Sequence, residues 1–162
     1  MIVVIIPALN EEEVIGDVVR SIPMLADRII VVDNGSTDRT TERAAEAGAI
    51  IVAQPVRGYG RACRAGMNAA IAAGADIIVF IDGDGSDCPE FLGALVTPIV
   101  QGEYDFVIGS RIRGKREPGS LTLQQIAAGR LAVGCCRFAT ALSSPICRHF
   151  ERFVARCSKR SQ

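Results

Sequence analysis

The chain has 162 residues, 49% of them hydrophobic, and its 18 basic residues balance 18 acidic ones. This length and composition predict one globular domain with a substantial core and exclude a disordered chain. The net charge of zero gives no basis for nucleic-acid binding, so we expect no such partner. No apolar run reaches the roughly 18 residues of a membrane span, and an apolar run starts the chain at once, so we expect no leader and a cytoplasmic location.

Short apolar runs predict strands that alternate with helices along most of the chain. The predicted strands cover residues 2–6, 28–32, 50–53, 76–81 and 105–108. This alternation is typical of βαβ units, so we expect a single α/β domain with a mostly parallel sheet flanked by helices. The sequence shows no internal repeat and no clear domain boundary before residue 130.

Capping and breaking residues set the ends of the predicted helices. Asn10 and Glu13 are predicted to form the N-cap pair of the first helix. Proline and glycine are predicted to mark the other helix ends, because neither residue is favoured inside a helix. These residues are Pro23, Gly48, Gly74 and, at the start of the helix that reaches about Val100, Pro89.

Polar clusters directly follow four of the five predicted strands. They occupy residues 7–11, 33–38, 82–87 and 109–111. The carboxyl ends of parallel strands lie on one edge of the sheet, where open α/β sheets bind their ligands. The four clusters are therefore predicted to form one binding site on that edge.

The cluster after the fourth strand places two carboxylates between glycines, in the stretch Asp82-Gly83-Asp84-Gly85. Carboxylate oxygens suit Mg²⁺ or Mn²⁺, which bind proteins through one or two carboxylates together with substrate phosphates. The glycines allow a backbone to approach a ligand closely. The alternative is a polar turn with solvated acids, and the convergence of the four clusters favours the metal site over that alternative.

The six cysteines do not form a recognisable metal or disulfide framework. Cys63 and Cys88 stand alone, and the other four lie near the end of the chain, at positions 135, 136, 147 and 157. No Cys-x-x-Cys pair and no Cys/His spacing typical of zinc is present, so we expect no zinc site. In a cytoplasmic chain these cysteines are expected to be free thiols.

Taken together and in this order, the polar motifs resemble those of the family 2 glycosyltransferases of the GT-A fold, and among them the branch of dolichyl- and polyprenyl-phosphate sugar synthases. The resemblance covers residues 1–133 and implies a Rossmann-like, mostly parallel sheet flanked by helices. The matching motifs are Pro7-Ala8-Leu9-Asn10-Glu11, Val32-Asp33-Asn34-Gly35-Ser36-Thr37-Asp38, Arg57-Gly58-Tyr59-Gly60, Asp82-Gly83-Asp84, Gly109-Ser110-Arg111 and the segment from Arg116 to Gln125.

The resemblance also implies roles for individual residues. The first motif would line the nucleotide base and ribose, Asp33 would read the base, and a glycine-rich turn would cover the nucleotide. Asn34 replaces the commoner second acid of its motif, which leaves base contacts possible but removes one charge. The residues with implied nucleotide contacts are Pro7, Ala8, Asn10, Glu11, Asp33, Gly58, Gly60, Arg61 and Asp82.

The implied reaction is the transfer of a hexose from a UDP- or GDP-hexose to a polyprenyl phosphate or similar acceptor at a membrane surface. Asp82 and Asp84 would hold Mg²⁺ or Mn²⁺, with Asp84 as the ligand proper, and Arg111 would lie near the phosphates. A cation and an arginine would stabilise the charge that develops on the departing diphosphate. A phosphate acceptor is already anionic, so no general base is needed. The protein would then work in the cytoplasm, peripherally at the inner membrane face.

Other interpretations of these residues stay open or are excluded at this point. Asn10 and Glu11 could simply cap a helix, residues 33–38 could be a turn, and Arg111 could be a solvated charge. A dehydrogenase would need G-x-G-x-x-G after the first strand, which is absent. By resemblance, phosphatases with an aspartate nucleophile carry it after the first strand rather than the fourth.

The predicted domain ends near residue 133, and residues 134–162 form an atypical basic, cysteine-rich tail. Between residues 130 and 162 there are seven Lys or Arg, and Glu151 is the only acid. We expect that the chain is shortened relative to longer family members and lacks the last strand of the sheet and part of the acceptor site. A nucleotide-sugar-binding protein without turnover is therefore the alternative function. The tail could also be a basic amphipathic helix at a membrane surface.

Overall fold

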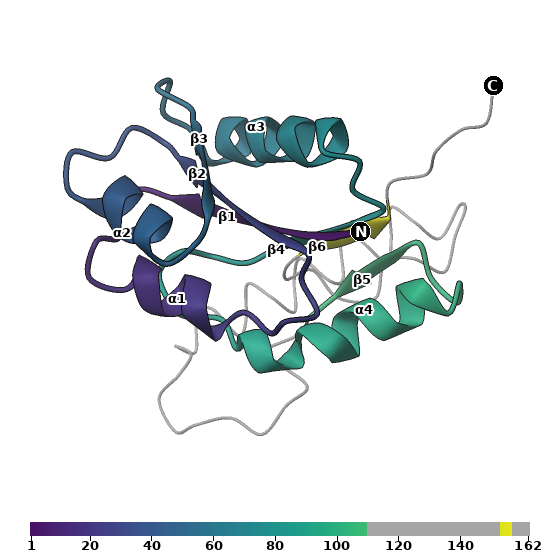
Figure 1. Ribbon diagram of the computed structural model, residues 1–162. Helices are drawn as coiled ribbons and strands as arrows, with labels where there is room; N and C mark the ends of the chain where they lie inside the picture. Colours follow the sequence, from purple (N-terminus) through teal and green to yellow (C-terminus); the bar gives the residue numbers. More distant parts are fainter. Residues whose placement is uncertain (110–152, 157–162) are drawn as a thin grey trace, which may run out of the picture.

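The computed structural model describes residues 1–109 and 153–156, and these residues contain one six-stranded sheet (Figure 1). The strand order is β3-β2-β1-β4-β6-β5. In chain order the strands are β1 (Ile2–Ala8), β2 (Arg28–Asp33), β3 (Ile50–Ala53), β4 (Ile77–Phe80), β5 (Phe106–Ile108) and β6 (Phe153–Arg156).

Strands β1 to β4 pair in parallel, which confirms the predicted mostly parallel sheet. Strand β1 lies between β2 and β4 and continues through Pro7 and Ala8, which pair with Val32 and Asp33. The sequence pattern predicts that this strand ends at residue 6, but the strand continues to Ala8, which still pairs with Asp33 on β2. The chain moves outward from β1 to β3 and then crosses back to β4, so the direction of winding reverses between β1 and β4.

Strand β6 lies between β4 and β5 and is antiparallel to both. Val154 pairs with Val79 on one side and with Val107 on the other. The expectation that the chain lacks the last strand of the sheet is therefore wrong, because part of the predicted tail supplies it. The predicted domain boundary near residue 133 lies outside the described residues and stays a prediction.

Helices cover both faces of the sheet (Figure 1). Helix α3 (Tyr59–Ala72) covers one face, and α1 (Ile15–Ser21), α2 (Thr40–Glu46) and α4 (Leu92–Val100) cover the other. Strand β1 is buried on both sides, with Val3 and Ile5 in the cluster under α3 and Val4 and Ile6 in the cluster under the other helices. This double burial explains why β1 is a continuous apolar run rather than an alternating one.

The helix ends follow the sequence pattern except at the start of α1. Helices α2 and α3 end just before Gly48 and Gly74, and a 3₁₀ turn, η1 (Pro89–Phe91), leads into α4, as predicted. The predicted N-cap pair of Asn10 and Glu13 is wrong. Helix α1 starts at Ile15 with no side-chain cap, and the Asn10 side chain accepts a hydrogen bond from the Thr37 N–H instead.

Two observations concern the cysteines and membrane contact. Cys63 is partly buried and Cys88 is exposed, and both are free. Within residues 1–109 and 153–156, no helix is long and apolar enough to cross a membrane.

A stripe of small residues lets α3 lie close to the sheet. Ala62, Gly66 and Ala70 recur every four residues and are buried against β1 and β2. A Cβ atom at Gly66 would overlap Cγ2 of Ile5 and lie 3.0 Å from Cγ2 of Val32. The helix therefore sits at a distance from the sheet that only glycine permits at this position.

Gly66→Ala is expected to lower the free energy of unfolding by about 1–3 kcal/mol, the usual cost of an extra carbon in a packed core. Urea denaturation at constant pH would measure this change. Gly60→Ala on the same helix is the matched control, because a Cβ there meets nothing within 4 Å. It is expected to leave stability unchanged or raise it by up to about 1 kcal/mol through helix propensity. Equal effects of the two substitutions would contradict this description of the packing.

Candidate functional site

An open cleft of about 370 Å³ lies at the carboxyl edge of the sheet. Its walls come from the loop after β1, the loop after β4, and the segments after β2 and before α3. The winding reverses between β1 and β4, so these two loops diverge and leave space between them, as at other ligand sites of open α/β sheets. The lining residues are Pro7, Ala8, Leu9, Glu11, Asn34, Arg57, Gly58, Tyr59, Asp82, Gly83 and Asp84.

Three carboxylates from two loops make the cleft acidic. Glu11 follows β1, and Asp82 and Asp84 follow β4. The pKa of Glu11 is raised above its ordinary value, first by burial and then by the negative charges of Asp84 and Asp38. The electrostatic influence of Asp84 on Glu11 shows that the two loops bring their charges close enough to repel each other.

The loop after β4 is shaped by hydrogen bonds from its own backbone. The Asp82 N–H donates to Oδ2 of Asp87 at 2.9 Å, and the Ser86 N–H donates to Oδ1 of Asp84 at 2.9 Å. Gly83 lies against β1, where a Cβ would be 3.1 Å from the carbonyl oxygen of Pro7. A glycine at this position therefore brings the loop next to the floor of the cleft.

The acidic residues fit a divalent cation that also binds ligand oxygens. In the described part of the chain, no three His, Cys, Asp or Glu residues come together as a metal site built from protein groups alone. Mg²⁺ and Mn²⁺ commonly use one or two carboxylates and complete their shell with phosphate oxygens and water. Burial and, after it, the negative charges of Asp84 and Asp38 raise the pKa of Glu11, and a cation in the cleft would offset these negative charges.

The opposite wall of the cleft is held in place by Asn34, for which the resemblance implied a possible base contact and the loss of one charge. Asn34 is 7% exposed, and its Oδ1 accepts a hydrogen bond from the Gly58 N–H at 3.1 Å. Gly58 has φ 143°, which side-chain-bearing residues rarely adopt. Arg57 donates from Nη2 to the carbonyl oxygen of Gly35 at 3.3 Å and brings a positive charge to the cleft.

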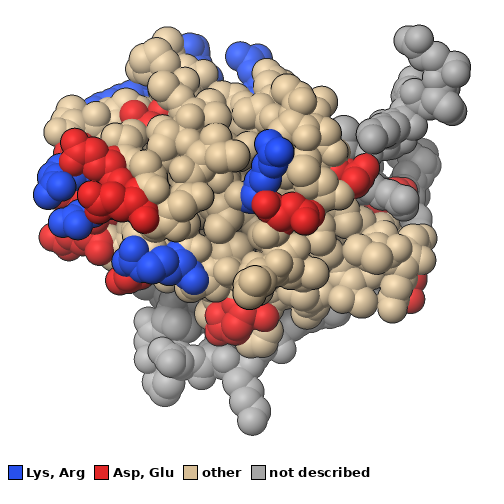
Figure 2. Space-filling model, in the orientation of Figure 1, with Lys and Arg blue, Asp and Glu red and all other residues tan. Residues whose placement is uncertain are grey.

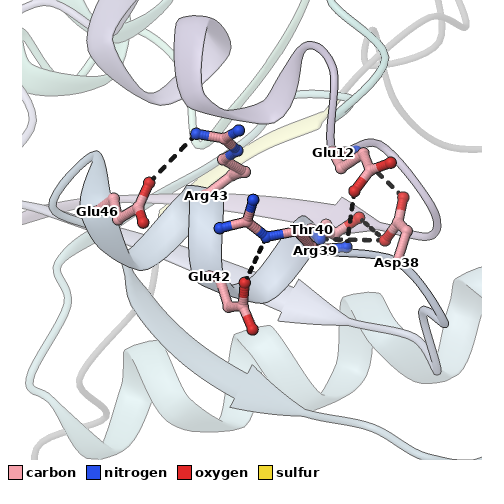
Figure 3. Close-up of polar contacts among 7 residues, drawn as sticks. All are labelled: Glu12, Asp38, Arg39, Thr40, Glu42, Arg43 and Glu46. Carbon is pink, nitrogen blue, oxygen red and sulfur yellow. Dashed lines mark hydrogen bonds and ion pairs between the residues drawn. The ribbon is translucent and has the colours of Figure 1, made fainter.

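The loop after β1 is held against the loop after β2 by reciprocal hydrogen bonds (Figure 3). The Asp38 carboxylate accepts from the N–H groups of Glu12 and Thr40 and from the Thr40 hydroxyl, while the Glu12 carboxylate accepts from the Arg39 N–H at 2.9 Å. The buried Thr40 hydroxyl in turn accepts from the Glu11 N–H at 2.8 Å. These hydrogen bonds, led by the Thr40 hydroxyl, lower the pKa of Asp38. Glu11 thus reaches the cleft from a braced backbone.

Asn10 adds a second brace between the same loops. Its φ of 57° is the only positive value at a non-glycine residue among the described residues, and asparagine tolerates that conformation better than most side chains. Its Oδ1 accepts from the Thr37 N–H at 2.8 Å, and its N–H donates to the Ser36 hydroxyl at 3.0 Å. The Asn10 side chain therefore shapes the loop rather than lining the cleft.

Charges on the outer surface of α2 pair with one another. Arg39 lies 2.8 Å from Glu42, and Arg43 lies 3.6 Å from Glu46 (Figure 3). Figure 2 shows blue and red side chains side by side at the left of the view, where Figure 1 places α2. Exposed pairs of this kind contribute little to stability, because water screens the attraction between the charges.

The structure brings together only part of the predicted site. Asp33, Gly60 and Arg61 do not line the cleft, nor does Asn10, and Asp33 instead accepts a hydrogen bond from the Ser36 N–H within its own turn. Arg111 lies outside the described residues. Of the predicted site residues, those that line the cleft are Pro7, Ala8, Glu11, Gly58, Asp82 and Asp84.

Sequence reasoning missed Arg57 and Tyr59 as lining residues. Both stand in the motif Arg57-Gly58-Tyr59-Gly60, so the glycine-rich turn was the available signal. Glycines mark where a backbone bends, but the side chains that the bend presents to a ligand are its neighbours.

Comparison with known proteins places the chain among glycosyltransferases. The chain is 32% identical over 136 residues to the UDP-N-acetylglucosamine–dolichyl-phosphate N-acetylglucosaminyltransferase of Methanococcus voltae, covering 72% of this chain and 54% of that protein. The chain spans about half the length of the curated relatives it matches.

Solved structures share both sequence and fold with this chain. Glucosyl-3-phosphoglycerate synthase of Mycobacterium tuberculosis, in complex with Mn²⁺, UDP-glucose and phosphoglyceric acid, is 33% identical with a TM-score of 0.65, covering 96% of this chain and 56% of that one. A structure of the same enzyme with Mg²⁺ and UDP has a TM-score of 0.63, an identity of 34% and coverage of 96% and 56%. The expected GT-A type of α/β fold is confirmed by these neighbours.

The model of one family matches nearly the whole sequence, from residue 3 to residue 157. This range includes β6, so the segment expected to be foreign to the family contains residues that the family model matches. The GT-A type fold and the acidic cleft at the point where the winding reverses agree with this match. The chain therefore belongs to glycosyl transferase family 2.

Proposed function

We propose that this chain binds a nucleotide-diphosphate sugar together with Mg²⁺ or Mn²⁺ and transfers the hexose to a phosphate-bearing acceptor. The observation that carries the proposal is the meeting of Glu11, Asp82 and Asp84 in one cleft at the point where the winding reverses. Such a cleft suits a diphosphate, whose charge a bound cation neutralises. The related enzyme with bound Mn²⁺ and UDP-glucose supports a UDP-hexose as donor.

The cleft residues divide between the nucleotide and the diphosphate. Pro7 and Ala8, the last two residues of β1, provide an apolar wall, and Arg57 provides a positive charge on the opposite side. Asp82 and Asp84 are the residues that would hold the cation, which when bound supplies charge stabilisation for the leaving diphosphate. Arg111, predicted from the sequence to lie near the phosphates, would add a bidentate contact.

The acceptor is proposed to be a polyprenyl phosphate or a similar phosphate at a membrane surface. The relatives support a phosphate-bearing acceptor, since one is named as a transferase to dolichyl phosphate and another was solved with phosphoglyceric acid. An acceptor of this class brings its own anionic oxygen, so the protein needs to position it rather than remove a proton. Work on such an acceptor would take place in the cytoplasm, at the inner face of the membrane.

A nucleotide-sugar-binding protein without turnover is the second candidate. It requires only the donor cleft, whose lining residues all lie between Pro7 and Asp84. The donor cleft is the same under both proposals, so donor binding alone does not separate them. Formation of a glycosylated polyprenyl phosphate from UDP-glucose would establish the transferase, and donor binding with no product would favour the second candidate.

Asp84→Asn is expected to abolish the metal-dependent stabilisation of the protein by UDP, because the amide cannot supply the charge that a divalent cation requires. A ligand at a hundred times its dissociation constant adds about 2.7 kcal/mol, which for a domain of this size raises Tm by roughly 5–10 °C. Thermal unfolding with UDP, GDP or CDP, each with and without Mn²⁺, would measure the effect and identify the base. Asp105→Asn is the matched control, since Asp105 is exposed and outside the cleft. A full Mn²⁺-dependent shift in Asp84→Asn would contradict the assignment.

Glu11→Gln is expected to stabilise the metal-free protein while weakening binding of UDP with Mn²⁺. The raised pKa of Glu11 means that its ionised form is disfavoured in the folded state, so the charge lowers stability at pH values above that pKa. Removing the charge should raise Tm by roughly 1–2 °C near pH 7. The gain should shrink as the pH falls through the raised pKa and vanish below the ordinary value for glutamate.

Thermal unfolding of the metal-free protein between pH 4 and pH 8 would test this, with Glu13→Gln as the control because Glu13 is exposed and outside the cleft. A constant difference between Glu11→Gln and the unsubstituted protein across this range would count against the charge repulsion at Glu11.

A further inference from the structure

Tyr59 reaches across the cleft from the first position of α3 to the loop after β4. Its hydroxyl donates a hydrogen bond to Oδ1 of Asp82 at 3.2 Å. Both residues line the cleft, and the tyrosine is 61% exposed, so the remainder of its ring is accessible at the cleft. This contact joins the two walls that would enclose a bound nucleotide.

The position of Tyr59 is set by the residues just before it. The Gly58 N–H is held by the buried Asn34 side chain, and the unusual φ of Gly58 turns the chain into α3. Tyr59 therefore starts the helix from a fixed point and is not a side chain on a loose loop.

The chemistry of the pair makes Tyr59 a donor that orients Asp82 without neutralising it. An ionised carboxylate only accepts hydrogen bonds, so the phenol must be the donor. A phenol is protonated at neutral pH and therefore has the hydrogen that this bond requires. A lysine or arginine at the same place would compete with a cation for the negative charge of Asp82, whereas a neutral hydroxyl uses one lone pair and leaves the charge.

We propose that Tyr59 is a positioning residue of the donor site, whose hydroxyl holds the Asp82 carboxylate in the orientation that a divalent cation and its nucleotide require. The inference rests on the proposed function, in which Asp82 contributes to cation binding. Through Tyr59, helix α3 would therefore contribute to metal-dependent binding of the donor. Tyr59 acts through Asp82 and does not itself touch the cation.

Tyr59→Phe tests the inference because it removes one oxygen atom and keeps the ring. Isothermal titration of the full chain with UDP, in the presence and absence of Mn²⁺, would give the two affinities. We expect the Mn²⁺-dependent affinity to fall about tenfold, as for the loss of a hydrogen bond to a charged group, and the affinity without Mn²⁺ to stay unchanged. A role in folding alone would lower both affinities alike, so the ratio of the two identifies positioning.

The chain supplies a matched control in Tyr104→Phe. Tyr104 is the other tyrosine of the chain, it is 59% exposed, and it lies outside the cleft. Tyr104→Phe should leave both affinities and Tm unchanged. Unchanged Mn²⁺-dependent binding in Tyr59→Phe, equal to that of Tyr104→Phe, would overturn the inference while leaving the proposed function intact. No UDP binding by the unsubstituted chain with Mn²⁺ would overturn the proposed function and this inference with it.

Discussion

The reversal of winding between β1 and β4 is the constraint on which the rest of the site depends. Crossover connections between parallel strands are almost always right-handed, so strands added on opposite sides of β1 place their helices on opposite faces of the sheet. Helices α1 and α2 therefore cover one face and α3 covers the other. The loops after β1 and β4 consequently part from each other, and the cleft with its carboxylates is the space between them.

The loops around the cleft are braced by side chains that satisfy backbone groups. Asp38 and Thr40 hold the backbone of the loop after β1, and Asn34 holds the turn before α3. Because these bonds join groups of the protein itself, they hold the backbone next to the cleft residues in place. A braced site loses less conformational freedom when it binds, which leaves more of the contact energy for affinity. The polar motifs of the chain thus serve both as cleft lining and as support for it.

The negative charges of the cleft lower the stability of the folded protein but favour the binding of a cation. Glu11 and Asp84 repel each other in the protein alone, and this repulsion contributes to the raised pKa of Glu11. Under the proposed function, a divalent cation held by Asp82 and Asp84 would offset the negative charge near Glu11 and so relieve this repulsion. The membership of the chain in glycosyl transferase family 2, with relatives solved in complex with Mn²⁺ or Mg²⁺ and UDP, agrees with this electrostatic logic.

The amino-acid sequence by itself determined where the first five strands lie along the chain and where α2 and α3 end. It also determined that Glu11, Asp82 and Asp84 lie at one edge of the sheet. These features follow from local patterns, because a buried parallel strand is an apolar run and its ligand-binding end is the polar segment that follows it. Only the tertiary structure decided the partners of Asn10 and Tyr59 and the insertion of β6 between β4 and β5. Each of these contacts joins residues that are distant in sequence, so the local pattern around Asn10 or Tyr59 does not predict its partner. A strand of four residues likewise has too short a pattern to predict the strands with which it pairs.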